Sequence, residues 1–127
     1  MKINLIYTYN KKMRDPIVYT NIVNNKKNRE YFFIDDNGDF LGKYSVLENL
    51  VHSVYVSRKH RGEGLCKKMI KDATRRYKKL ILHVRPNNIA AIKCYEGAGF
   101  KKKELIKNFY DDFYGGKPEN ILLYSYG

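Results

Sequence analysis

This 127-residue sequence lacks a long apolar run, a Pro/Ser-rich tract and any internal repeat. A membrane helix needs about 20 consecutive apolar residues, and no segment approaches that length. The apolar start, from Ile3 to Tyr9, is too short for a signal peptide and lacks a small-residue cleavage site. The composition is that of a globular protein rather than a disordered one. We therefore expect a single domain over residues 1–127 that is intracellular, in the cytoplasm, with no membrane partner.

Cysteine is also scarce, since the chain has only Cys66 and Cys94. Each falls in a helix-like stretch, and their spacing does not match that of metal ligands. Small buried hydrophobes are a common role for cysteine. We interpret both residues in that way, rather than as a disulfide or a zinc site, and expect no metal.

Acidic residues are few, with 13 Asp and Glu against 25 Lys and Arg, and the formal net charge is +12. Clustered basic residues can indicate nucleic-acid binding, and they are densest here between Arg58 and Lys79. No aromatic stacking motif, zinc-finger spacing or recognition-helix pattern accompanies them. We interpret most of these residues as the solvated face of a helix and do not expect a nucleic-acid partner.

Alternating patterns predict strands and apolar residues at helical spacing predict helices, while Asn37-Gly38 predicts a hairpin turn. Asn88 is a candidate N-cap. The expected elements are a strand from Lys2 to Tyr9, one or two short helices between Lys11 and Asn28, strands Glu30 to Ile34, Phe40 to Glu48 and Leu50 to Val56, a helix beginning at Gly64, a strand Leu80 to Val84, a helix Ile89 to Glu96, and strands Phe100 to Tyr110 and Asn120 to Tyr126.

A glycine-containing loop, Arg61-Gly62-Glu63-Gly64-Leu65-Cys66, joins the strand ending at Val56 to the helix that follows. Glycines allow several backbone N–H groups to approach one point, and the amino end of a helix adds positive potential. The loop is therefore a candidate phosphate-binding loop. A tight strand-to-helix connection is the alternative.

The order of strand, RGxG loop, helix and strand, followed by N-x-x-A-x-x-x-Y-x-x-x-G-F, resembles the GNAT family of N-acetyltransferases, whose cofactor is acetyl-coenzyme A. The second motif consists of Asn88, Ala91, Tyr95, Gly99 and Phe100. The resemblance implies a mixed α/β fold of the α+β type. Its sheet would be mostly antiparallel, with six or seven strands, a splayed fourth and fifth strand, and flanking helices.

The resemblance also implies how coenzyme A would bind. The loop would hold the pyrophosphate, helped by charge from Arg58, Lys59 or Arg61, and the pantetheine arm would pair with the fourth strand like an added strand. A backbone N–H of that strand could stabilise the oxyanion. The implied cofactor-binding residues are Val54, Val56, Arg61, Gly62, Glu63, Gly64, Leu65, Cys66, Asn88 and Tyr95.

The implied reaction is direct attack of a primary amine on acetyl-coenzyme A in a ternary complex. Tyr95 matches the family tyrosine proposed to protonate the leaving thiolate, and its alternative role is aromatic packing. His83 is the candidate base, by resemblance to some protein N-terminal acetyltransferases; a hydrogen-bonded core histidine is the alternative. His52 and Glu48 are reserve bases.

The acceptor is the least determined part. Asn108-Phe109-Tyr110 resembles the substrate-binding segment of N-terminal acetyltransferases, so Phe109 and Tyr110 are candidate substrate-binding residues and a peptide amino end is the expected acceptor. Lysine side chains, polyamines and other small amines remain alternatives. A non-catalytic module that only binds acyl-coenzyme A is a further one.

Overall fold

The computed structural model describes residues 13–109 and 118–127, so the expected strand from Lys2 to Tyr9 and the candidate residue Tyr110 lie outside the described residues. The described chain forms one seven-stranded sheet in the order β1-β2-β3-β4-β5-β7-β6. All neighbouring strands are antiparallel except β4 and β5. The strands are β1 (Ile17–Val23), β2 (Lys26–Ile34), β3 (Phe40–Leu47), β4 (Leu50–Val56), β5 (Leu80–Val84), β6 (Lys101–Phe109) and β7 (Glu119–Tyr126).

The first described strand corrects one expectation. The stretch between Lys11 and Asn28 was expected to hold one or two short helices, but the structure has β1 and the start of β2 there, paired as a hairpin. Asn24 and Asn25 form the turn with φ of 50° and 62°. Two consecutive residues with positive φ suit a two-residue hairpin loop, and Asn is one of the few residues that tolerates this conformation. The Asn-Asn pair therefore reverses the chain, and the β-branched residues before it form a strand.

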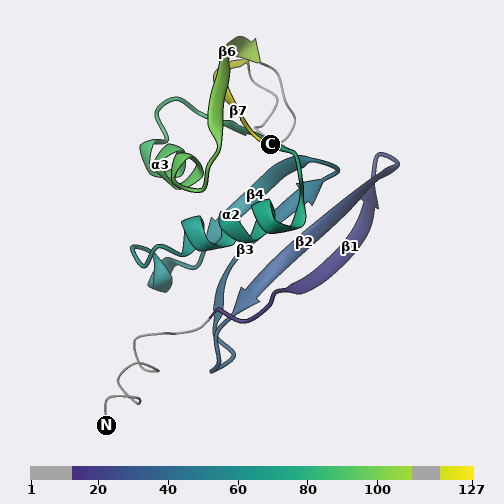
Figure 1. The fold of residues 1–127 in the computed structure, drawn as a ribbon, viewed down its shortest axis with the longest axis vertical. Coiled ribbons are helices and arrows are strands. Elements are labelled where there is room, and N and C mark those ends of the chain that lie inside the picture. The colour runs from purple at the N-terminus through teal and green to yellow at the C-terminus, as the bar shows by residue number, and fades with distance from the viewer. Residues whose placement is uncertain (1–12, 110–117) are drawn as a thin grey trace.

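Two α-helices and one 3₁₀ turn accompany the described sheet. Helix α2 (Leu65–Arg76) follows η1 (Arg58–His60), and α3 (Ile89–Gly97) follows β5. Figure 1 shows α2 crossing the face of the β2–β4 part of the sheet, and α3 beside β6 and β7. No helix of residues 13–109 or 118–127 is long and apolar enough to cross a membrane.

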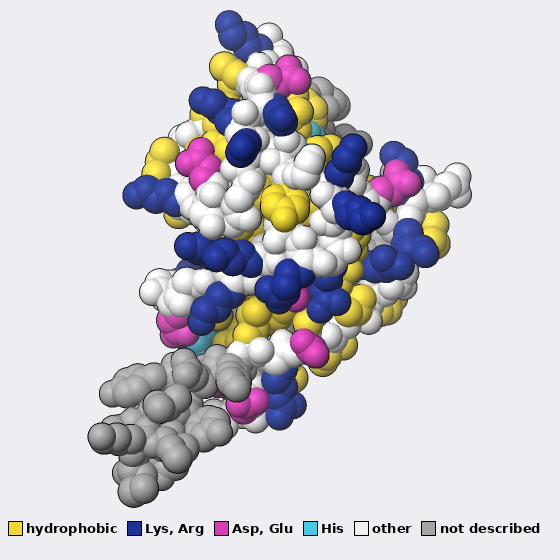
Figure 2. Space-filling view, viewed as in Figure 1, with side chains coloured by type: hydrophobic (Ala, Val, Ile, Leu, Met, Phe, Trp, Pro, Cys, Tyr) yellow, Lys and Arg dark blue, Asp and Glu magenta, His cyan; other side chains and the backbone are white. Residues whose placement is uncertain are grey.

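Helix α2 buries the apolar stripe expected from its sequence. Its outward face is basic, and Figure 2 shows Lys and Arg side chains scattered over this side of the molecule, with Asp and Glu between them. This distribution favours the interpretation of the basic residues as a solvated face. The buried apolar residues of α2 are Leu65, Met69, Ile70 and Ala73.

One buried carboxylate interrupts that stripe. Asp72 is 4% exposed and accepts hydrogen bonds from the Tyr44 hydroxyl at 2.7 Å and from Arg76 Nε at 2.8 Å. Burial, followed by the hydrogen bond to Asp72, raises the pKa of Tyr44 far above its usual value. This network fixes α2 against β3, and α2 in turn fixes the loop at its amino end.

The sheet opens between β4 and β5, as the predicted splay requires. The two strands pair only at Leu50 with Ile81 and at Val51 with Leu82. Beyond these pairs the β5 side of β4 has no partner strand among the described residues. The opening places an unpaired stretch of β4 backbone between β5 and the two helices.

Candidate functional site

Two cavities meet where β4 and β5 separate. We call them the splay pocket, of about 280 Å³, and the loop pocket, of about 500 Å³. Val54, Asn88 and Tyr95 line both. The splay pocket is also lined by Leu50, Val51, His52, Ser53, Leu82, His83, Val84 and Arg85, and the loop pocket by Val56, His60, Arg61, Gly62, Gly64, Leu65, Cys66, Ala90 and Ala91.

The loop before α2 depends on its two glycines. Gly62 and Gly64 have φ of 83° and 77°, a conformation that favours glycine, and an added Cβ at either position would meet no other atom within 4 Å. Space therefore remains open in front of the loop. Gly64 is the N-cap of α2 and supplies no side-chain cap, so the N–H groups of the first helical turn remain available to an anion.

Arg61 attaches this loop to the end of β4. Its Nε donates to the carbonyl of Val56 at 3.1 Å, and its guanidinium lies 5.6 Å from the centre of the Tyr55 ring. A positive charge is thus held beside the loop pocket. Glu63, another candidate cofactor-binding residue, is not among the described residues that line that pocket, and its carboxylate lies 3.5 Å from Nδ1 of His60.

The cysteines correct a second expectation. They were interpreted as separate buried hydrophobes, but the structure joins Cys66 to Cys94 in a disulfide with Cα atoms 6.0 Å apart. The reason is the close packing of α2 on α3, where a Cβ at Gly97 would lie 3.4 Å from the Lys67 side chain. Sequence spacing did not indicate the pairing because the residues are 28 positions apart. The disulfide borders the loop pocket through Cys66.

A β-bulge against β3 lies in the part of β4 that has no described partner strand on its β5 side. Lys43 pairs with Tyr55 and Ser45 with His52, so β4 carries one residue more than β3 between these pairs. Ser53 in the bulge has φ of 53°, which is uncommon for a residue other than glycine. Bulges redirect backbone groups and occur frequently beside active sites. Sequence reasoning missed Ser53, since nothing in the sequence marks the bulge.

His83 lies in β5 between two buried neighbours, Leu82 and Val84, and lines the splay pocket. Its ring centre is 4.8 Å from that of Phe109, at the end of β6. The structure therefore brings the candidate base and one candidate substrate-binding residue together. Arg85, which sequence reasoning did not select, lines the same pocket and donates through Nε to Glu119 at 2.9 Å.

The reserve bases are placed differently. His52 lines the splay pocket, but its Nε2 lies 2.8 Å from Oδ1 of Asn28 and its Nδ1 lies 2.9 Å from Oγ of Ser53. Burial, followed by the charge of Lys43, lowers the pKa of His52. Both ring nitrogens of this histidine are thus engaged. Glu48 lies outside both pockets, with its carboxylate 3.8 Å from Lys26.

Asn88 and Tyr95 belong to the beginning and end of α3. The Asn88 side chain accepts from the N–H of Ala91 at 3.2 Å, which confirms the expected N-cap. Tyr95, two turns later, is 8% exposed and packs near Phe100, with ring centres 6.3 Å apart. The capped helix holds Tyr95 at the junction of the two pockets.

Comparison with known proteins identifies the family. Residues 3–100 match the acetyltransferase (GNAT) family. The chain belongs to this family. The splayed β4–β5 pair and the glycine loop before α2 are the features that the resemblance implied for a GNAT fold. No curated protein sequence matches the chain.

Solved structures similar to this GNAT chain include spermidine N-acetyltransferases of Vibrio cholerae. A spermidine/spermine N-acetyltransferase in complex with manganese ions is 19% identical, with a TM-score of 0.62, 77% of this chain covered and 64% of that one. A complex with CoA and spermine is 16% identical, with a TM-score of 0.65, 98% of this chain covered and 72% of the other. This chain thus spans somewhat less than two thirds of the manganese-bound relative. These likenesses show the fold, and they do not indicate an N-terminal acetyltransferase.

Proposed function

We propose that this GNAT chain transfers the acetyl group of acetyl-coenzyme A to a small primary amine. The observation that carries the proposal is the meeting of the two pockets at Val54, Asn88 and Tyr95. A thioester entering from the loop pocket and an amine entering from the splay pocket would come together there. The amine nitrogen attacks the carbonyl carbon, a C–N bond forms, the C–S bond breaks, and coenzyme A leaves as the thiol.

The loop pocket has the features that a coenzyme A donor needs. Residues 61–66 offer backbone N–H groups and the amino end of α2 to the pyrophosphate, with the Arg61 guanidinium held nearby. The pantetheine arm would lie along the β5 side of β4, near Val54 and Val56, and would pair with the backbone there as an added strand does.

Two residues that line the splay pocket would carry out the proton transfers. His83 would accept the proton of the attacking amine, because it lines the splay pocket into which that amine would enter. Tyr95 would donate a proton to the departing sulfur. The bulged backbone near Val54 would supply an N–H to the oxyanion of the tetrahedral intermediate.

A small amine fits the splay pocket better than a large substrate. Its volume of about 280 Å³ is just below the roughly 300–1,000 Å³ that is typical of ligand pockets. Among its described lining residues there is no carboxylate, so recognition would rest on shape and on the reacting amine. The CoA and spermine complex of a relative supports polyamines as the first acceptors to test. A peptide amino end, with Phe109 beside His83, is the competing outcome.

The test is acetylation of an acceptor panel with mass-spectrometric readout. Spermidine, lysine peptides with blocked amino ends and free-amine peptides are each incubated with acetyl-coenzyme A. We expect one acetyl group on spermidine or another small amine. Acetylation confined to peptide amino ends would replace the acceptor assignment, and no acetylation of any amine would contradict the proposed activity.

A matched pair of glycine variants tests the donor site. Gly64→Ala and Gly38→Ala both place a side chain at positive φ, 77° and 83°, in open space, so both should cost a similar 1–2 kcal/mol, roughly, in stability. Gly38 lies in the β2–β3 turn, outside both pockets. With EDTA present to remove any bound metal ion, only Gly64→Ala should weaken coenzyme A binding. Equal affinities in the two variants would contradict the loop assignment.

A further inference from the structure

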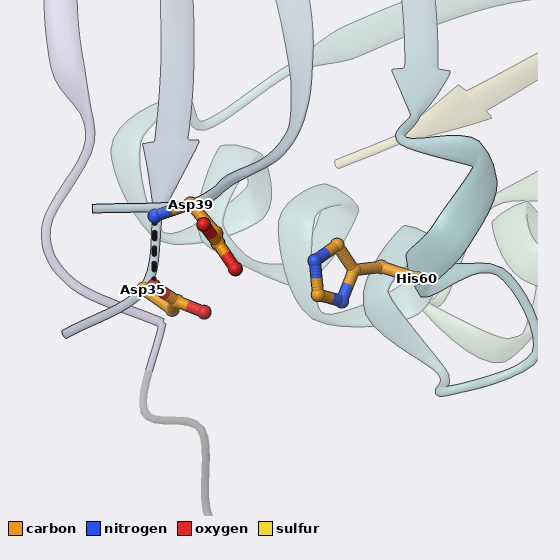
Figure 3. Close-up of side chains that lie close together, drawn as sticks. All are labelled: Asp35, Asp39 and His60. Atoms are coloured by element: carbon orange, nitrogen blue, oxygen red, sulfur yellow. Dashed lines mark hydrogen bonds between the residues drawn. The ribbon is translucent and has the colours of Figure 1, made fainter. Parts of the chain in front are cut away.

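Three potential metal ligands from two segments of the chain, the β2–β3 turn and η1, come together next to the glycine loop of residues 61–66. Asp35 directly follows β2, Asp39 directly precedes β3, and His60 ends η1. One ligand atom from each lies within 4.8 Å of the other two. Figure 3 shows the two carboxylates and the imidazole directed toward one another. None of these residues belongs to the proposed chemistry.

His60 is the observation that points to a ligand. Its side chain is 3% exposed, yet neither ring nitrogen makes a hydrogen bond within the described part of the chain. Leaving a buried polar group without a hydrogen bond costs about 1–3 kcal/mol. In Figure 3 one ring nitrogen faces the carboxylates of Asp35 and Asp39. A cation between them would give that nitrogen a partner.

The surroundings of the cluster resemble the outer shell of a metal site. The Oδ1 atom of Asp35 accepts the backbone N–H groups of Asn37 at 2.8 Å and of Asp39 at 2.9 Å, which fixes the carboxylate. Nδ1 of His60 lies 3.5 Å from Oε1 of Glu63. A metal-bound histidine usually directs its second nitrogen at a carboxylate, and Glu63 occupies that place.

We propose that Asp35, Asp39 and His60 form a binding site for a divalent transition-metal ion such as Zn²⁺. One imidazole nitrogen and two carboxylate oxygens suit such ions. Bonds of about 2.1 Å place tetrahedral ligand atoms about 3.4 Å apart, so the cluster, whose ligand atoms lie within 4.8 Å of one another, would contract by up to about 1.4 Å. Asp39 can supply this movement, because its side chain is 47% exposed; the movement would compete with its 3.7 Å approach to Lys59. Water would complete the coordination.

The site goes beyond the proposed transfer reaction and does not depend on it. His60 lines the loop pocket and directly precedes Arg61. A bound ion would therefore tie the start of the cofactor loop to the β2–β3 turn. The sequence-based expectation of no metal came from the spacing of the cysteines, which says nothing about ligands that the β2–β3 turn and η1 bring together.

Isothermal titration with Zn²⁺ tests the site in the metal-free full chain, without reductant so that the disulfide stays closed. We expect one ion per chain, and at least about tenfold weaker binding in His60→Gln and Asp39→Asn. Asp36→Asn and His52→Gln are matched controls that remove a neighbouring carboxylate and another imidazole, and both should bind as the parent chain does. Because the Asp39 side chain is half-exposed, Asp39→Asn should fold normally. It therefore tests the site even if His60→Gln, which alters a buried side chain, misfolds.

Hydrogen exchange gives an independent readout. Saturating Zn²⁺ should slow amide exchange in residues 58–64 of the parent chain and leave the Asp39→Asn variant unchanged. The proposal is overturned if the parent chain binds no Zn²⁺, or if both ligand variants bind it as tightly as the parent.

Discussion

Opening the disulfide between Cys66 and Cys94 should destabilise the protein by an amount that follows from its position. The two residues are 28 positions apart, and the loop-entropy relation for that length gives about 3.6 kcal/mol at 25 °C. For 127 residues the entropy of unfolding is about 0.27 kcal/mol/K. The melting temperature should therefore fall by about 13 °C on reduction.

The assay is thermal unfolding followed by circular dichroism, with and without a reductant that does not absorb in the far ultraviolet. The double variant Cys66→Ser/Cys94→Ser is the control, because reductant should not change its melting temperature. Alkylation and mass measurement report the free thiols of the untreated protein. An unchanged melting temperature on reduction, or two free thiols in protein purified under oxidising conditions, would refute the reasoning. In a reducing cytoplasm, the location expected from the sequence, this disulfide would be open. The protein would there lack the stabilisation that the assay measures.

Three further perturbations probe the site and its support. Replacing His83 with alanine should lower kcat at neutral pH by about 100-fold or more, while the affinity for coenzyme A is retained. If the variant turns over as fast as the parent chain at all pH values around neutrality, His83 is not the base. Asp72→Ala should lower the free energy of unfolding, measured by urea denaturation, by about 3 kcal/mol, because it leaves the Tyr44 hydroxyl buried without its acceptor. Adding Tyr44→Phe should recover part of this loss. A loss below about 1 kcal/mol would show that the network contributes little. Burial, followed by the hydrogen bond to Glu96, raises the pKa of Tyr124 to about 12, and the pKa of Tyr44 is raised as well. In the unfolded chain these tyrosines would lose their protons near pH 10, roughly, whereas in the folded protein Tyr44 and Tyr124 stay protonated there. The free energy of unfolding should therefore be unaffected by these two residues below about pH 10 and should fall above it. Denaturation curves that give the same stability on both sides of this pH would contradict the raised pKa values.

Local features of the fold could be predicted from the sequence because they depend on neighbouring residues. Gly62 and Gly64 mark a loop that needs positive φ, and Asn88 caps the helix that it directly precedes. The hairpin turn at Asn37-Gly38 could be predicted for the same reason. By contrast, Asn24-Asn25 is a weaker turn signal, and the strand before it was interpreted as helix.

Features that join distant segments could not be predicted in this way. The disulfide depends on how closely α2 packs on α3, and the bulge at Ser53 depends on the register of β4 against β3. The cluster around His60 needs the β2–β3 turn and η1 in place together. Family resemblance supplied His83 and Tyr95, and the structure adds that both line the same pocket.

Acetyl transfer itself tests the central claim most directly. The measurement follows the full chain with acetyl-coenzyme A and the panel of spermidine, blocked lysine peptides and free-amine peptides by mass spectrometry, alongside the Gly64→Ala and Gly38→Ala variants. The account predicts an acetylated amine and an equal amount of free coenzyme A from the parent chain and from Gly38→Ala, with a large loss for Gly64→Ala. Binding of coenzyme A without acetylation of any amine in the panel would contradict it.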